Sequence, residues 1–119
     1  MHPSEFLYFS RWLLMEASGH EEANYRTAAD RAYLASALLL ADILLTRFGI
    51  EVPRTTRFYH TIERRTAELD LHIKNRITFL RDIRNDADYD LVLAFDKNNA
   101  ERAISAAQEI MNRLSEKFS

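Results

Sequence analysis

The sequence predicts an all-α protein, folded as one helical bundle. The 119 residues include only two Gly and two Pro, too few for the many tight turns of a sheet protein. Residues 32–45 form an apolar run that only Ser36 and Asp42 interrupt. Apolar side chains also recur every three or four residues from Ala100 to Phe118, which is the spacing of one helical face. A chain of this length suits a single domain, residues 1–119.

The first helix is expected from Ser4 to Ala17, before the break at Gly19. Its apolar side chains repeat at helical spacing: Phe6, Phe9, Trp12 and Leu13. The second helix is expected from Glu21 to Gly49 and contains the long apolar run. A helix that is apolar on nearly every side must be surrounded by other elements, so we expect it at the centre of the bundle. It is too short and too interrupted to span a bilayer.

The third helix is expected from Arg57 to Glu68, with Thr55 or Thr56 as its cap. It has few apolar side chains and should therefore lie at the surface. The fourth is expected from Leu69 to Ala87 or slightly beyond, with one apolar stripe: Leu69, Ile73, Ile77, Leu80, Ile83 and Ala87. Asp86, Asp88 and Asp90 should end it, and the last helix follows a turn at residues 96–99.

Arg84 falls inside the apolar stripe of the fourth predicted helix. An Arg at such a position must be paired, extend to solvent, or face a cleft or a second subunit. A shared cleft would imply a homodimer. An internal ion pair is the alternative, and its candidate acidic partners are Asp30, Asp42, Asp86 and Asp88.

The charge of the chain is concentrated in its middle third. Residues 54–84, the basic segment, hold eight basic and four acidic side chains, whereas the two flanking segments each carry a net charge of −3. Seven of the eight cations are Arg, whose planar fork matches phosphate geometry. We therefore consider Arg57, Arg64, Arg65 and Arg81 as RNA-binding residues. The alternative is a solvated helix face with local ion pairs.

Several kinds of chemistry have no matching pattern in the sequence. The chain has no Cys, which excludes disulfides, thiolate catalysis and Cys-bound zinc. None of its four His pairs with another at helical spacing, so we expect no metal, and no glycine-rich phosphate loop suggests a cofactor. The alternating aspartates near residue 88 lack the Gly and Glu of a calcium loop. The N-terminus does not read as a signal peptide, and a cytoplasmic protein is expected.

Three segments resemble one known family when they are taken together. The segment RTAADRAYLASALLLADILL resembles the second helix of HEPN domains, small helical proteins of prokaryotic toxin–antitoxin and defence loci. FYHTIERRT and RNDADYDL resemble segments that follow in stand-alone members, in the same order and spacing. The resemblance covers about residues 4–118. It implies an up-and-down bundle of four or five helices, usually a homodimer.

The resemblance also implies a site that cuts RNA without metal through paired Arg-x(4–6)-His motifs. Arg84 matches the Arg of the motif, and Asn85 matches the Asn that often follows it. The position five residues after Arg84 holds Tyr89 instead of His. Tyr has an ordinary pKa of about 10 and is a poor base at neutral pH. His60 is the other candidate for proton transfer.

Two functions are therefore expected from the sequence. The first is an RNA-directed HEPN protein of a toxin–antitoxin or defence system, which binds RNA and cuts it weakly or not at all. The second is a non-catalytic dimer of the same fold that binds a protein partner, such as a nucleotidyltransferase or an antitoxin. A plain helical scaffold without a ligand is a third alternative that no feature favours.

Overall fold

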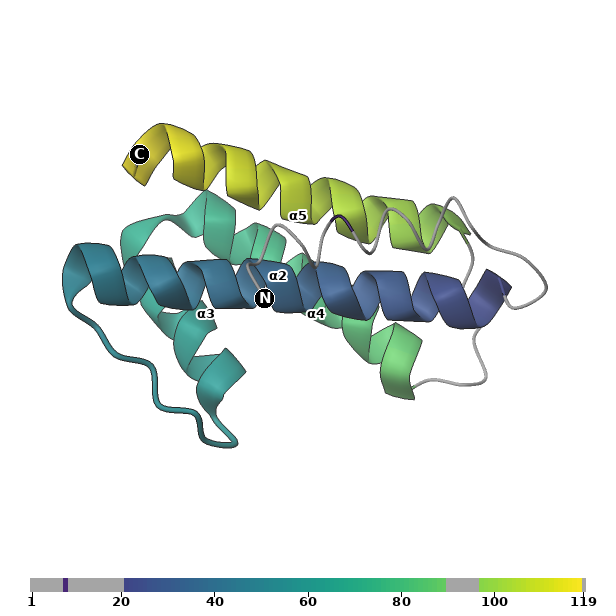
Figure 1. Ribbon diagram of the computed structural model, residues 1–119, viewed down its shortest axis with the longest axis horizontal. Helices are drawn as coiled ribbons and strands as arrows, with labels where there is room; N and C mark the ends of the chain where they lie inside the picture. Colours follow the sequence, from purple (N-terminus) through teal and green to yellow (C-terminus); the bar gives the residue numbers. More distant parts are fainter. Residues whose placement is uncertain (1–7, 9–20, 90–96, 119) are drawn as a thin grey trace.

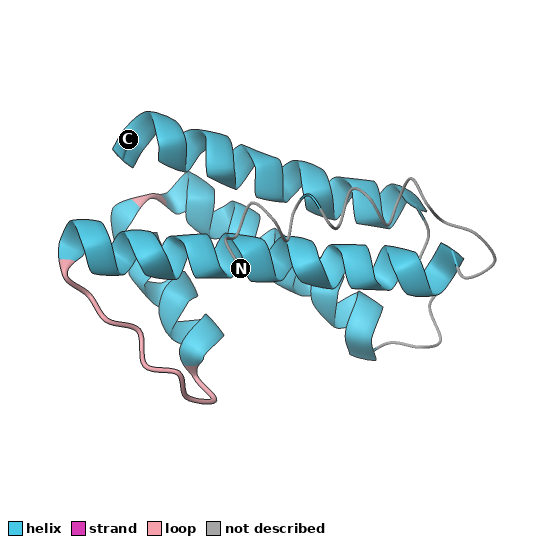
Figure 2. Cartoon of the chain, in the orientation of Figure 1, coloured by secondary structure: helices cyan, strands magenta, loops and turns pink. Residues whose placement is uncertain are grey.

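The computed structural model describes residue 8, residues 21–89 and residues 97–118. Along the chain, the described helices are α2 (Glu21–Phe48), α3 (Phe58–Leu69), α4 (Leu71–Tyr89) and α5 (Lys97–Phe118). The described ranges contain no strand, as Figure 2 shows, and the all-α prediction is confirmed. The helix expected from Ser4 to Ala17 lies, apart from residue 8, outside the described residues.

The long apolar helix α2 is the centre of the bundle. It packs against each of the other three helices, most extensively against α5 and α4. Figure 1 shows α2 and α5 running in the same direction, with α4 running the opposite way. The ring centroids of Phe48 and Phe118 lie 5.5 Å apart, so the C-terminal ends of α2 and α5 meet. No described helix is both long and apolar enough to cross a membrane.

Alanine determines how closely the helices approach. Four alanines of α2 have no exposed surface, namely Ala28, Ala29, Ala32 and Ala35. The N-terminal half of α5 contributes a matching buried set, Ala100, Ala103, Ala106 and Ala107. The distance between two helix axes depends on the size of the side chains between them, and small side chains allow the shortest distances. The larger buried side chains of α2, such as Leu40 and Leu44, lie towards its other end.

Gly49 terminates α2 but is not part of the helix, although it was expected to be its last residue. The helix ends one residue earlier, at Phe48, because Gly49 adopts a φ of +67°. Only Gly enters this left-handed region without a steric penalty. The N–H of Gly49 donates to the carbonyl of Leu45 (3.1 Å), which is the usual bond of a left-handed helix end.

Helices α3 and α4 form a hairpin with Asp70 at its apex. The boundaries differ from the prediction: α3 extends to Leu69, and α4 begins at Leu71 instead of Leu69. The Asp70 carboxylate accepts hydrogen bonds from the N–H groups of His72 (2.9 Å) and Ile73 (3.1 Å). Asp70 is therefore the N-cap of α4, a role in which Asp is strongly favoured.

The predicted surface position of α3 is wrong for one of its faces, because Phe58, Ile62, Glu63 and Thr66 are buried. Its start is also different from the prediction. The Thr55 hydroxyl accepts a hydrogen bond from the N–H of Arg57 (3.2 Å), but the cap residue Arg57 makes no side-chain cap bond itself. The opposite face of α3 is solvent-exposed and carries Arg64, one of the candidate RNA-binding residues, whereas Arg81 lies on α4.

Candidate nucleic-acid interface

Arg84 lies at the junction of three helices. Its Nε donates to Asp30 Oδ1 of α2 at 2.8 Å. Its guanidinium carbon lies 5.3 Å from the ring centroid of Tyr33 on α2 and 5.4 Å from that of Tyr59 on α3. Arg84 therefore makes an internal ion pair, and Asp30 was one of its four candidate partners. The Arg84 side chain retains 23% of its exposure.

Tyr33 and Tyr59 both make cation–π contacts with the guanidinium of Arg84. The ring centroids of Tyr33 and Tyr59 are 5.3 Å apart, and the planes are tilted by 54°. Burial, and next the Glu63 carboxylate, raises the pKa of Tyr33 well above its ordinary value. Tyr33 thus remains a neutral phenol at physiological pH and cannot serve as a base. Its role at this junction is packing and cation–π contact.

The other residues of the expected catalytic set are spread along two helices. Asn85 is exposed on α4 beside Arg84, and Tyr89 is the last residue of α4, with a side chain outside the described part of the chain. His60 is exposed on α3. Successive residues of a helix point about 100° apart, so His60 turns away when Tyr59 faces Arg84. The structure does not bring His60 into the junction around Arg84.

His60 belongs instead to a basic pocket on α3. A pocket of about 180 Å³ is lined by Arg57, His60, Thr61 and Arg64. These four positions follow the spacing of one helical face, i, i+3, i+4 and i+7. Among the described residues, neither Arg57 nor Arg64 has a carboxylate partner, and no acidic side chain lines the pocket. We call this set the α3 basic face.

The two other predicted RNA-binding arginines pair with acidic neighbours. Arg65 lies 3.4 Å from Glu68 on the same helix. Arg81 of α4 lies 3.1 Å from Glu63 of α3, whose carboxylate is buried. Thr78 also donates to Glu63 (3.0 Å). Each guanidinium thus has a local counter-charge, whereas those of the α3 basic face do not.

A family comparison decides what kind of domain carries these sites. A model of the HEPN domain matches residues 16–117, which is most of the chain and includes all four described helices except the last residue of α5. This chain is a HEPN domain. No curated protein and no solved structure matches it. In the part of the chain that the structure describes, no group of three or more His, Asp or Glu side chains could hold a metal ion.

The amino-acid sequence of this HEPN domain indicates each of these candidate residues singly but not their grouping. Arg57, His60 and Arg64 were each chosen for their side-chain chemistry, although their spacing already places them on one face. The Tyr33 and Tyr59 rings around Arg84 were missed. No local pattern indicates them, because the three residues come from three different helices.

Proposed function

We propose that this HEPN domain binds single-stranded RNA through the α3 basic face. The observation that carries the proposal is the pocket formed by Arg57, His60, Thr61 and Arg64, in which two arginines lack any described carboxylate partner. Guanidinium, imidazole and hydroxyl groups all donate hydrogen bonds to phosphate oxygens. A partner-free guanidinium can bind phosphate without first breaking an ion pair.

Weak or absent cleavage is the second part of the proposal. Metal-independent cleavage needs a group that exchanges a proton near pH 7, next to a group that stabilises the phosphate. His60 and Arg84 lie in different surroundings, and Arg84 already contacts Asp30. The family resemblance further supports a cytoplasmic role in a toxin–antitoxin or defence system.

Binding is tested with a fluorescein-labelled oligouridylate of twelve nucleotides and anisotropy at several salt concentrations. We expect weak binding that falls as salt rises, because bound cations release counterions from the RNA. Arg57→Ala and Arg64→Ala should each weaken binding and reduce the slope of log K against log salt by about 0.7. Arg65→Ala is the matched control, since this arginine lies on the same helix but pairs with Glu68.

Two outcomes would contradict the binding proposal. If the wild-type protein leaves the anisotropy unchanged even at low salt, the α3 basic face does not bind RNA. If Arg65→Ala weakens binding as much as Arg64→Ala, the attraction is a diffuse effect of positive charge. Circular dichroism of each variant separates either outcome from a loss of fold.

Cleavage is tested by an RNA digest with EDTA present. We expect little or no product from the wild-type protein. Any product should depend on Arg84, whereas His60 would contribute only if its ring reached the Arg84 junction. Arg84→Ala and His60→Ala are therefore compared with Tyr89→Phe and Tyr89→His. Robust cleavage that survives both Arg84→Ala and Tyr89→Phe would place the catalytic site elsewhere.

The second candidate function is a non-catalytic dimer that binds a protein partner, such as a nucleotidyltransferase or an antitoxin. The internal pairing of Arg84 with Asp30 favours this alternative, because it explains the Arg without any RNA. The two functions differ in the binding experiment above. RNA binding that depends on Arg57 and Arg64 supports the first, and its absence at low salt supports the second.

A further inference from the structure

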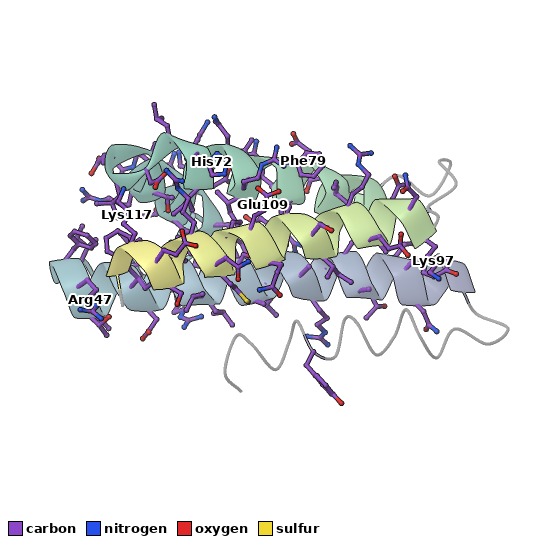
Figure 3. All side chains as sticks on the ribbon, turned by 90° about the horizontal axis from the view of Figure 1, so that it is seen from above. Arg47, His72, Phe79, Lys97, Glu109 and Lys117 are labelled. Atoms are coloured by element: carbon purple, nitrogen blue, oxygen red, sulfur yellow. The ribbon has the colours of Figure 1, made fainter. Side chains whose placement is uncertain are left out.

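A second surface lies on another side of the bundle, in the seam between α4 and α5. A groove of about 510 Å³ is lined by two residues of α4 and six of α5: Arg76, Phe79, Asn98, Glu101, Arg102, Ser105, Ala106 and Glu109. Figure 3 looks down on this seam and shows Phe79 on α4 and Glu109 on α5. The positions on α5 run from Asn98 to Glu109, which corresponds to a length of about 16 Å at the helical rise of about 1.5 Å per residue.

The centre of the groove is an aromatic ring with two arginines. The guanidinium carbons of Arg76 and Arg102 lie 4.8 Å and 5.2 Å from the ring centroid of Phe79. Among the described residues, neither guanidinium has a carboxylate partner. A cation–π contact uses the face of the ring and leaves the N–H donors of the guanidinium available. The arginines are therefore held in place with free hydrogen-bonding capacity.

The carboxylates of the groove lie to either side of this centre along α5, and each has a basic neighbour. Glu101 lies 3.9 Å from Lys97, one turn earlier on the same helix. Glu109 lies 3.6 Å from His72 of α4, which is an ion pair whenever the imidazole is protonated. Charge along α5 thus alternates from Glu101 through Arg102 to Glu109. A continuous polyanion such as RNA would meet repulsion from both carboxylates.

We propose that the α4–α5 groove docks a segment of a partner protein in which an acidic side chain lies beside an apolar one, with basic side chains on either side. The acidic side chain binds Arg76 and Arg102, and bidentate contact makes Arg well suited to carboxylate. The apolar side chain contacts Phe79 and Ala106. The flanking basic side chains face Glu101 and Glu109. Charge complementarity therefore selects a mixed-charge peptide.

The test uses a labelled peptide with the central sequence Lys-Leu-Glu-Phe-Lys and a matched peptide with Gln in place of Glu. We expect the first to bind at least about tenfold more tightly, because a hydrogen bond between charged groups is lost in the second. Chemical shifts of ¹⁵N-labelled protein should change at Phe79 and Arg102. The peptide pair requires no change to the protein, so misfolding cannot explain the result.

Protein variants locate the interaction. Arg102→Glu should lower the affinity for the Glu-containing peptide about tenfold or more, since it removes a charge-assisted contact. Arg47→Glu, at an exposed position in the last turn of α2, is the control and should leave it unchanged. The proposal is overturned if neither peptide binds, if both bind equally, or if the shifts lie on α3. Displacement of the peptide by oligouridylate would also overturn it, because the groove would then bind nucleic acid.

Discussion

Individual charged residues decide how the helices of this protein meet. Arg84 lies within an apolar stripe, where an unpaired charge would be costly. Asp30 supplies the counter-charge, and the rings of Tyr33 and Tyr59 cover the guanidinium. Asp70 acts in the same way at the other end of α4, where it joins α4 to the C-terminal turns of α5. A single side chain thus fixes the position of two or three helices.

The first residue-scale prediction concerns Arg84. Arg84→Ala should lower the free energy of unfolding by about 1.5–3 kcal/mol, the range for a hydrogen bond between charged groups. The upper range for fully buried pairs does not apply, because the Arg84 and Asp30 side chains keep 23% and 33% of their exposure. Urea unfolding measures the loss, and Asp30→Asn should show a similar one. An unchanged midpoint for Arg84→Ala would mean that the pair contributes no stability.

The second residue-scale prediction concerns pH. Burial by itself raises the pKa of Asp70, but hydrogen bonds from Arg113, from the N–H of Ile73 and from Lys117 outweigh it and hold the pKa well below its ordinary value. A carboxyl group whose pKa is lower in the folded state stabilises the fold at every pH above its pKa in the unfolded chain. This stability is lost as the pH falls from that value towards the pKa in the folded state. We expect a wild-type melting temperature that drops below about pH 4.

Asp70→Asn is the control for this pH dependence. It should be less stable than the wild type at pH 7 and should lose less stability on acidification, because the titrating carboxylate is gone. Arg113 Nε and Asp70 Oδ2 are 2.8 Å apart, so Arg113→Gln should have part of the same effect. Parallel acid curves for wild type and Asp70→Asn would show that other carboxylates control acid unfolding.

Helices α2 and α3 differ in how much of their surface is buried against the other helices. Helix α2 packs against all three other described helices and buries side chains from alanine to tyrosine at or below 2% exposure, although Asp42 and its last turn are exposed. Helix α3 buries one face and exposes the other, so a short polar segment can supply both a packing surface and the α3 basic face. The same division of faces lets α4 pack on α2 and line the α4–α5 groove.

The element-scale prediction compares two neighbouring leucines of α2. Leu40 is 2% exposed, whereas Leu39 is only partly buried. Leu40→Ala should lower the free energy of unfolding by about 2–5 kcal/mol, since it leaves a cavity in the core. Leu39→Ala should cost clearly less. Equal losses in a urea titration would mean that the two sides of α2 are equally covered.

At the scale of the whole molecule, one end of the bundle exposes large apolar side chains. Phe48 and Leu71 are 42% and 66% exposed, and Leu45 is 51% exposed. Figure 1 shows the end of α2 and the start of α4 at this same end. The internal pairing of Arg84 removes the original reason to place a dimer cleft on α4. These apolar side chains offer another contact between two copies.

The whole-molecule prediction is a homodimer that this apolar end helps to hold. Light scattering at tens of micromolar should give about twice the 13.9 kDa mass of one chain. Leu71→Glu should shift the mass towards the monomer, because it places a charge in the contact. Leu71 is mostly exposed, so the substitution should leave the fold intact. A monomeric wild-type protein would contradict the prediction.

The sequence by itself determined the all-α class, the central position of α2 and the face of α5 that packs against the other helices. These features follow from the scarcity of Gly and Pro, from the apolar run of α2 and from the apolar periodicity of α5, all of which can be read directly along the chain. It also indicated that Arg84 needs a partner, and Asp30 was among the candidates. Local patterns therefore predict which surfaces are buried, and they indicate which charged side chains need a partner of opposite charge.

Only the tertiary structure decided which partners those charges have. Asp30 is 54 residues from Arg84, and Asp70 is 43 residues from Arg113, so no local pattern specifies either pair. The boundary at Asp70 likewise depends on the fold, because that carboxylate caps α4 and binds α5 at the same time. The separation of His60 from Arg84 has the same cause. Helix packing sets which face of α3 meets α4, and His60 lies on the other face.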